Sequence, residues 1–117
     1  MKNRMVIDQS VASPEIVLFH VNAPLTKKRT SHFKMPLRDN ARLNEVGEEC
    51  KLLLRAIQFF GVEEASVYPY KIQIKLGKAF RLDEVGDHIK ARIATACFGV
   101  DPIYETETVF LANTKLV

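Results

Sequence analysis

Strict alternation of apolar and polar residues gives the strongest secondary-structure signal in this chain, at residues 71–76. Ile72, Ile74 and Leu76 would point to one side of a strand, and the Lys and Gln residues between them to the other. Such a strand has one buried and one hydrated face, which is typical of an antiparallel sheet.

Other strands are predicted from composition. Residues 15–21 and 65–68 are rich in β-branched and aromatic residues, and residues 32–35 alternate. We expect 15–21 and 32–35 to pair as a hairpin with a long, positively charged loop. The composition of residues 105–111 favours a further strand at a sheet edge, with a partly ordered tail as the alternative, whereas residues 1–14 are predicted to be a loose lead-in.

A long apolar stripe predicts the first helix. Asp39 or Asn40 can cap its start, and Gly61 stands where a left-handed C-terminal cap would lie. Gly47 falls inside this helix and would weaken it or permit close packing. The stripe consists of Leu43, Val46, Cys50, Leu53, Leu54, Ile57 and Phe60.

A second helix is predicted at residues 82–97 and would close at Gly99. Asp83 and Glu84 lie in its first turn, where negative charge favours the helix dipole. Its apolar stripe is Leu82, Val85, Ile89, Ile93 and Ala96.

The element order is therefore β-β-α-β-β-α, with a final strand left open. It predicts a two-layer α+β domain in which two helices cover one face of a small antiparallel or mixed sheet. The chain of 117 residues fits one domain, at residues 15–117, and its 47% hydrophobic and 26% charged residues are typical of a globular protein.

Positive charge is concentrated in the first third of the chain. The net charge is +3, but residues 1–40 hold seven Lys or Arg against three acids, and the remainder is slightly acidic. These cations could contact phosphates or an acidic partner, or they could form a solvated loop. The candidate binding residues are Lys27, Lys28, Arg29, Lys34 and Arg38.

Motifs for catalysis, cofactors and metals are missing. Cys50 and Cys97 form no CxxC pair, fall on apolar helix faces, and are expected to be reduced core residues, with a disulfide as the lesser alternative. His20 and His32 would face each other if their strands paired, but no third metal ligand is evident. We therefore expect no enzyme, no cofactor and no metal, in a cytoplasmic protein without a membrane span.

Residues 15–97 resemble the amino-terminal domain of Nfu/NifU-type iron–sulfur scaffold proteins. The resemblance rests on a helix ending in Ile57-Gln-Phe-Phe-Gly-Val62, on the strand–turn–strand unit at 67–74, and on Phe80 before the last helix. The run at 16–19 stands where the family has its first strand. The sequence lacks the cluster-binding CxxC of the family, so the resemblance implies a supporting domain and transfers no functional residue.

The preferred expectation is a non-catalytic interaction domain with a protein partner, and the resemblance implies a partner related to iron–sulfur assembly. Two alternatives remain at this point. One is an anion- or nucleic-acid-binding protein that uses the loop at 27–38, and the other is a regulatory domain that binds a metabolite. A homodimer is left open, and no membrane contact is expected.

Overall fold

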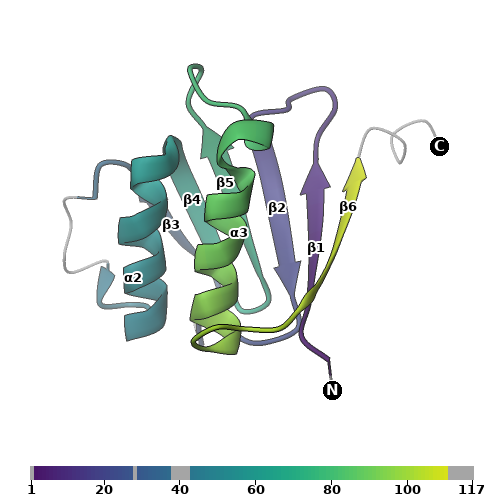
Figure 1. Cartoon of the computed structure of the whole chain (residues 1–117). Helices are drawn as coiled ribbons and strands as arrows, with labels where there is room; N and C mark the ends of the chain where they lie inside the picture. Colours follow the sequence, from purple (N-terminus) through teal and green to yellow (C-terminus); the bar gives the residue numbers. More distant parts are fainter. Residues whose placement is uncertain (1, 28, 38–42, 111–117) are drawn as a thin grey trace.

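The computed structural model describes residues 2–27, 29–37 and 43–110. Six strands form one open mixed sheet in the order β3-β4-β5-β2-β1-β6 (Figure 1). Neighbouring strands are antiparallel, except that β6 runs parallel to β1. The strands are β1 (Arg4–Gln9), β2 (Ile16–Val21), β3 (Ser31–Lys34), β4 (Val62–Tyr68), β5 (Lys71–Leu76) and β6 (Glu105–Phe110).

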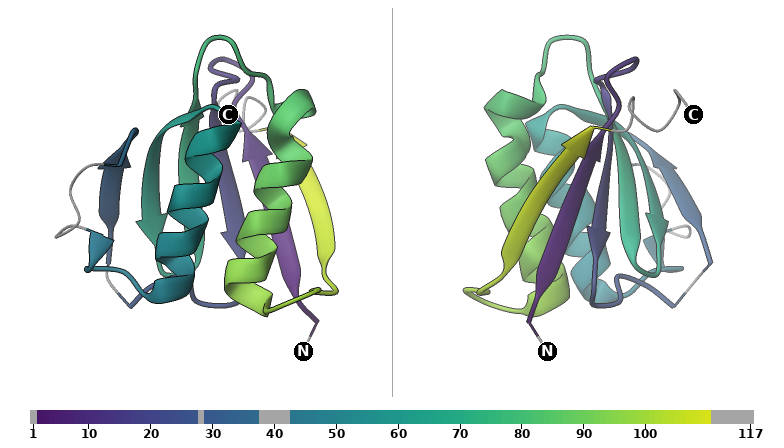
Figure 2. Two further views of the ribbon diagram at one scale, coloured as in Figure 1. Left: turned by 60° about the vertical axis from the view of Figure 1, so that its left-hand side comes forward. Right: turned by 90° about the vertical axis from the view of Figure 1, so that its right-hand side faces the viewer.

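Helices α2 (Glu48–Ile57) and α3 (Leu82–Phe98) lie side by side on one face of this sheet (Figure 2). A short 3-10 turn, η1 (Gln58–Phe60), joins α2 to β4. The predicted α+β class with two helices on one face is confirmed. The strand expected at a sheet edge is also present, as β6.

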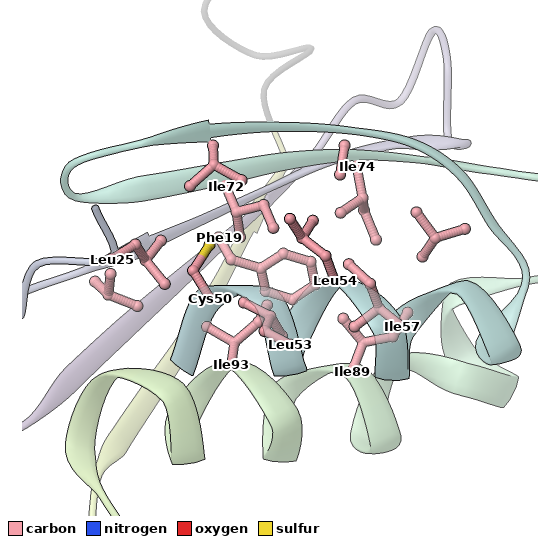
Figure 3. Packing of buried hydrophobic residues seen from close by; sticks show 14 of the residues in the cluster. Phe19, Leu25, Cys50, Leu53, Leu54, Ile57, Ile72, Ile74, Ile89 and Ile93 are labelled. Carbon is pink, nitrogen blue, oxygen red and sulfur yellow. The ribbon is translucent and has the colours of Figure 1, made fainter. Parts of the chain in front are cut away.

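One apolar core fills the space between the helices and the sheet (Figure 3). Phe19 is completely buried near its centre, and the alternating residues of β5 point into it as predicted. Burial of a large aliphatic or aromatic side chain stabilises a fold by about 1.5–3 kcal/mol. The completely buried side chains include Met5, Val17, Leu54, Ile57, Val67, Ile72, Ile74, Ile89 and Ile93.

The prediction of a loose lead-in over residues 1–14 is wrong, because residues 4–9 form strand β1. Met5 and Ile7 are 0% and 4% exposed, and they alternate with the more exposed Arg4, Val6 and Asp8. β1 pairs with β2 on one side and with β6 on the other. The apolar run Met5-Val6-Ile7 shows no polar–apolar alternation and is too short to distinguish a strand from an extended segment.

The predicted hairpin of residues 15–21 with 32–35 is also wrong. Both segments form strands, but β2 is flanked by β1 and β5, and β3 pairs with β4 instead. Because β1 and β5 use both hydrogen-bonding edges of β2, no edge is left for β3. The unrecognised strand β1 is therefore the origin of this error.

The apolar stripe of the first predicted helix corresponds from Cys50 onward to α2, which begins at Glu48. Gly47 does not lie inside it but is the N-cap of α2, with an extended backbone (φ −70°, ψ 169°). Leu43 and Val46 precede α2 and are nevertheless buried. Glycine favours this position because it is a poor helix former and caps a helix without steric cost. The proposed caps at Asp39 and Asn40 lie outside the described residues.

Gly61 ends the α2–η1 segment in a left-handed conformation, with φ 86°, as predicted. The ring of Phe80 packs against it so closely that a Cβ at position 61 would overlap the ring. Glycine is therefore required at position 61 for two reasons. Its φ is positive, and the absence of a side chain lets the segment that leads into α3 approach the backbone.

We predict that Gly61→Ala destabilises the fold by more than the roughly 1–2 kcal/mol expected for a left-handed alanine. The excess reflects the overlap with Phe80, so it should shrink when Gly61→Ala is made together with Phe80→Ala. Urea unfolding of the two single variants, the double variant and the wild type measures this coupling. A loss that is the same in both backgrounds would show that Phe80 does not constrain Gly61.

Candidate binding surface

The sheet has a second face, which we call the outer face, and neither α2 nor α3 lies against it (Figure 2). Its side chains alternate along each strand with those of the core. Most of them are half-buried rather than fully hydrated, because neighbouring strands shield them. The outer face includes Arg4, Val6, Asp8, Ile16, Leu18, His20, His32, Lys34, Glu64, Ser66, Tyr68, Lys71, Gln73, Lys75, Glu105, Glu107 and Val109.

A chain of polar contacts crosses the outer face from β3 to β5. His32 Nδ1 lies 2.7 Å from Ser66 Oγ, and His32 Nε2 lies 3.0 Å from Glu64 Oε1. The other oxygen of Glu64 is 3.8 Å from Lys75 Nζ. These side chains border a small hollow of about 170 Å³. Strand register produces the cluster, because His32 lies directly opposite Ser66.

This Ser–His–Glu arrangement resembles the order of groups that activates a serine nucleophile. Acyl transfer also requires donors that stabilise an oxyanion. At Ser66, β4 is paired with β3 on one side and β5 on the other, so the backbone N–H groups there lie in the plane of the sheet and do not point to the outer face. We therefore interpret the cluster as a polar network that orients His32.

His20 and His32 do not face each other, contrary to what the predicted hairpin implied. They lie on strands separated by β4 and β5. His20 Nε2 instead contacts Asp8 Oδ2 at 2.7 Å. Within the described ranges, no group of three or more His, Cys, Asp or Glu side chains is arranged to hold a metal ion.

Three of the candidate basic residues lie in or just before β3. Lys27 and Arg29 are exposed in the loop before β3, and Lys34 is exposed on the outer face of β3. The structure gives no ion pair to these three side chains among the residues that it describes. Lys28 and Arg38 lie outside the described residues.

Sequence reasoning missed Ser66, Glu64 and Asp8 as partners of the two histidines. Glu64 and Ser66 stand two residues apart, so a strand would place both on one face, and this signal was available. Which histidine they meet depends on strand order, and the wrong hairpin prediction concealed it.

A larger groove, of about 1060 Å³, lies on the helical side of the sheet. It runs between the first half of α3 and strands β1 and β6. Ile7 and Phe19 contribute to its floor, and Thr108 lies on the β6 side. The charged residues around it are of both signs and include Lys78, Arg81, Lys90, Glu15, Glu63, Asp83 and Asp87.

Both cysteines are free, as expected. Burial raises the pKa of the Cys50 thiol to about 12. Burial, together with the proximity of Cys50, raises the pKa of the Cys97 thiol to about 12 as well. A thiol with such a pKa is almost fully protonated at neutral pH and is a poor nucleophile.

Comparisons of the chain with protein families, with curated proteins and with solved structures found no match. Among the described residues, no helix is both long enough and apolar enough to cross a bilayer. The interpretation of function therefore depends on the surface itself.

We predict that neither Cys50 nor Cys97 reacts readily with a thiol reagent in the folded protein at pH 8. Labelling should be more than about 100-fold slower than in urea, because burial restricts access and suppresses the thiolate. Mass spectrometry after timed labelling measures both rates. Rapid modification of either cysteine without unfolding would contradict the packing described for α2 and α3.

Proposed function

We propose that this chain is a non-catalytic interaction domain that presents its outer face, together with the cations beside it, to an acidic surface on a protein partner. The observation that carries the proposal is the asymmetry of the sheet. Two helices bury one face, while the opposite face holds ordered polar pairs around half-buried Leu18 and Val6. A surface of this mixed character is similar to the rims and centres of protein interfaces.

The positive charges on β3, on β5 and in the loop before β3 favour a partner with an acidic surface. Lys34 and Lys75 lie on the outer face, and Lys27 and Arg29 extend from the adjacent loop. Of these four, Lys75 has a carboxylate of the described residues near it, at 3.8 Å. Exposed cations of this kind accelerate association with a negatively charged surface, and this acceleration becomes smaller as salt is added.

The resemblance to the Nfu amino-terminal domain is part of this proposal. The Gly61–Val62 junction lies between η1 and β4, the strand–turn–strand unit is β4–β5, and Phe80 precedes α3, in the order that the resemblance implies. Cytoplasmic location belongs to the proposal too, and two free thiols fit a reducing compartment.

Two other roles have some support. The same exposed cations would suit phosphate groups, so an anion- or nucleic-acid-binding protein is the second candidate. The groove beside α3 supports the third, a domain that binds a small metabolite, because its volume of about 1060 Å³ is at the upper end for ligand pockets.

The test compares two charge-reversed double variants of equal net charge. Lys27→Glu with Lys34→Glu alters the β3 side of the sheet, and Arg55→Glu with Arg92→Glu alters exposed positions on the helices. We expect crosslinking pull-down to recover an acidic protein with the wild type and with the helix variant. The sheet-side variant should recover at least about tenfold less, since opposite charge becomes like charge.

Equal recovery by the sheet-side variant and the wild type would contradict the proposal, as would recovery of no protein at all. If the material lost by the sheet-side variant is nucleic acid, the second candidate replaces the first. Its binding to an oligonucleotide should then fall steeply as salt rises.

A further inference from the structure

We propose that strand β6 is a self-association edge, at which a second copy of this chain adds its own β6 in antiparallel register. The proposal is independent of the outer face, because it uses an edge of the sheet that the proposed partner surface leaves open. Figure 1 shows β6 beyond β1, away from both helices.

The two edges of the sheet differ in their protection against pairing. β3 is only four residues long, carries exposed Lys34, follows the basic loop and is followed by Pro36. Short length, lysine and proline are features that prevent one sheet edge from pairing with another. β6 has six residues, Glu-Thr-Glu-Thr-Val-Phe, with no Lys, Pro or Gly. Its register with β1 is unbroken from Glu105 to Phe110.

The backbone of β6 has hydrogen-bonding groups directed away from the sheet. The Glu105 N–H donates to Asn3 O at 2.9 Å, so Glu105, Glu107 and Val109 direct their backbone groups toward β1. In a parallel ladder, the alternate residues then direct their N–H and C=O groups to the other side. Among residues 2–27, 29–37 and 43–110, no strand pairs with this side of β6, so Thr106 and Thr108 present donors and acceptors along an open edge.

Charge on β6 permits approach of an identical strand. Glu107 is paired with Arg4 at 2.8 Å, and Glu105 lies 3.9 Å from Lys2, so the two carboxylates are largely compensated within one copy. Like charges directly opposite each other would still be unfavourable in the new strand pair. The register must therefore avoid placing glutamate opposite glutamate.

One antiparallel register meets this condition and keeps most of β6 paired. Placing Thr108 opposite Thr108 of the second copy also places Glu107 opposite Val109. Registers centred on Glu107 or on Thr106 place glutamates opposite each other. A two-fold axis through Thr108 makes the contact isologous, so each copy satisfies the open edge of the other.

In this arrangement, the groove beside α3 of one copy lies next to the same groove of the second copy. The two-fold axis would stand perpendicular to a continuous twelve-stranded sheet, an extension of the six-stranded one, with both α3 helices on the same side. Thr108 lines the groove in each copy. The two grooves would therefore meet across the four central strands, and the second copy would close the side that β6 leaves open.

Cysteine crosslinking of the full chain tests both the contact and its register. Thr108→Cys places two thiols opposite each other at the axis, within the separation that a disulfide spans. Thr106→Cys is the matched control, because it faces position 110 of the second copy. With oxidised glutathione as the oxidant, we expect Thr108→Cys to form a covalent dimer at least about tenfold faster than Thr106→Cys or the wild type.

Sedimentation of the wild-type chain, into which no cysteine has been introduced, provides the second readout. We expect a mass that rises toward the dimer with concentration, and Thr108→Pro should weaken association at least about tenfold, because each copy loses the outward N–H. Proline is tolerated where an edge N–H faces solvent, and Thr108→Val, which keeps the N–H, should still associate.

A monomer at every concentration would overturn the proposal. Crosslinking of Thr106→Cys as fast as Thr108→Cys would overturn the register and with it the argument from charge. If Thr108→Pro fails to fold, as judged by circular dichroism, the crosslinking rates alone decide the outcome.

Discussion

Contact between the apolar face of one sheet and two helices is the interaction on which the rest of this structure depends. Alternate residues of β1, β2, β4 and β5 meet Leu54 and Ile57 of α2 and Ile89 and Ile93 of α3 in one cluster. Because side chains alternate along a strand, burial of one set of residues against the helices places the other set on the outer face. The polar network of the outer face is a consequence of the same register.

The chemical groups that the outer face and the edge β6 can offer depend on how completely each strand is paired. Inner strands such as β4 use their backbone groups on both sides, so their outer face can offer only side chains. The last strand offers backbone groups as well. The described part of the fold therefore has two different kinds of surface, a mixed polar face around His32 and His20, and a hydrogen-bonding edge at Thr106 and Thr108.

The local pattern was sufficient to predict the strands and helices that carry strong periodicity. Residues 71–76 alternate strictly, and the two apolar stripes end at Gly61 and Gly99, so their type and burial could be predicted. Strand pairing could not, because it depends on which edges compete for β2. Missing β1 therefore altered the predicted partners of β3 and of both histidines. The acidic partners of those histidines become visible only once the register is known.

A matched pair of alanine substitutions in β5 tests the division between sealed and open faces most directly. Ile74 is completely buried toward the helices, and its neighbour Gln73 lies on the outer face. In urea unfolding, Ile74→Ala should lose about 2–5 kcal/mol of stability, whereas Gln73→Ala should change it by no more than about 0.5 kcal/mol. Similar losses at both positions would contradict a sheet that is sealed on one face only.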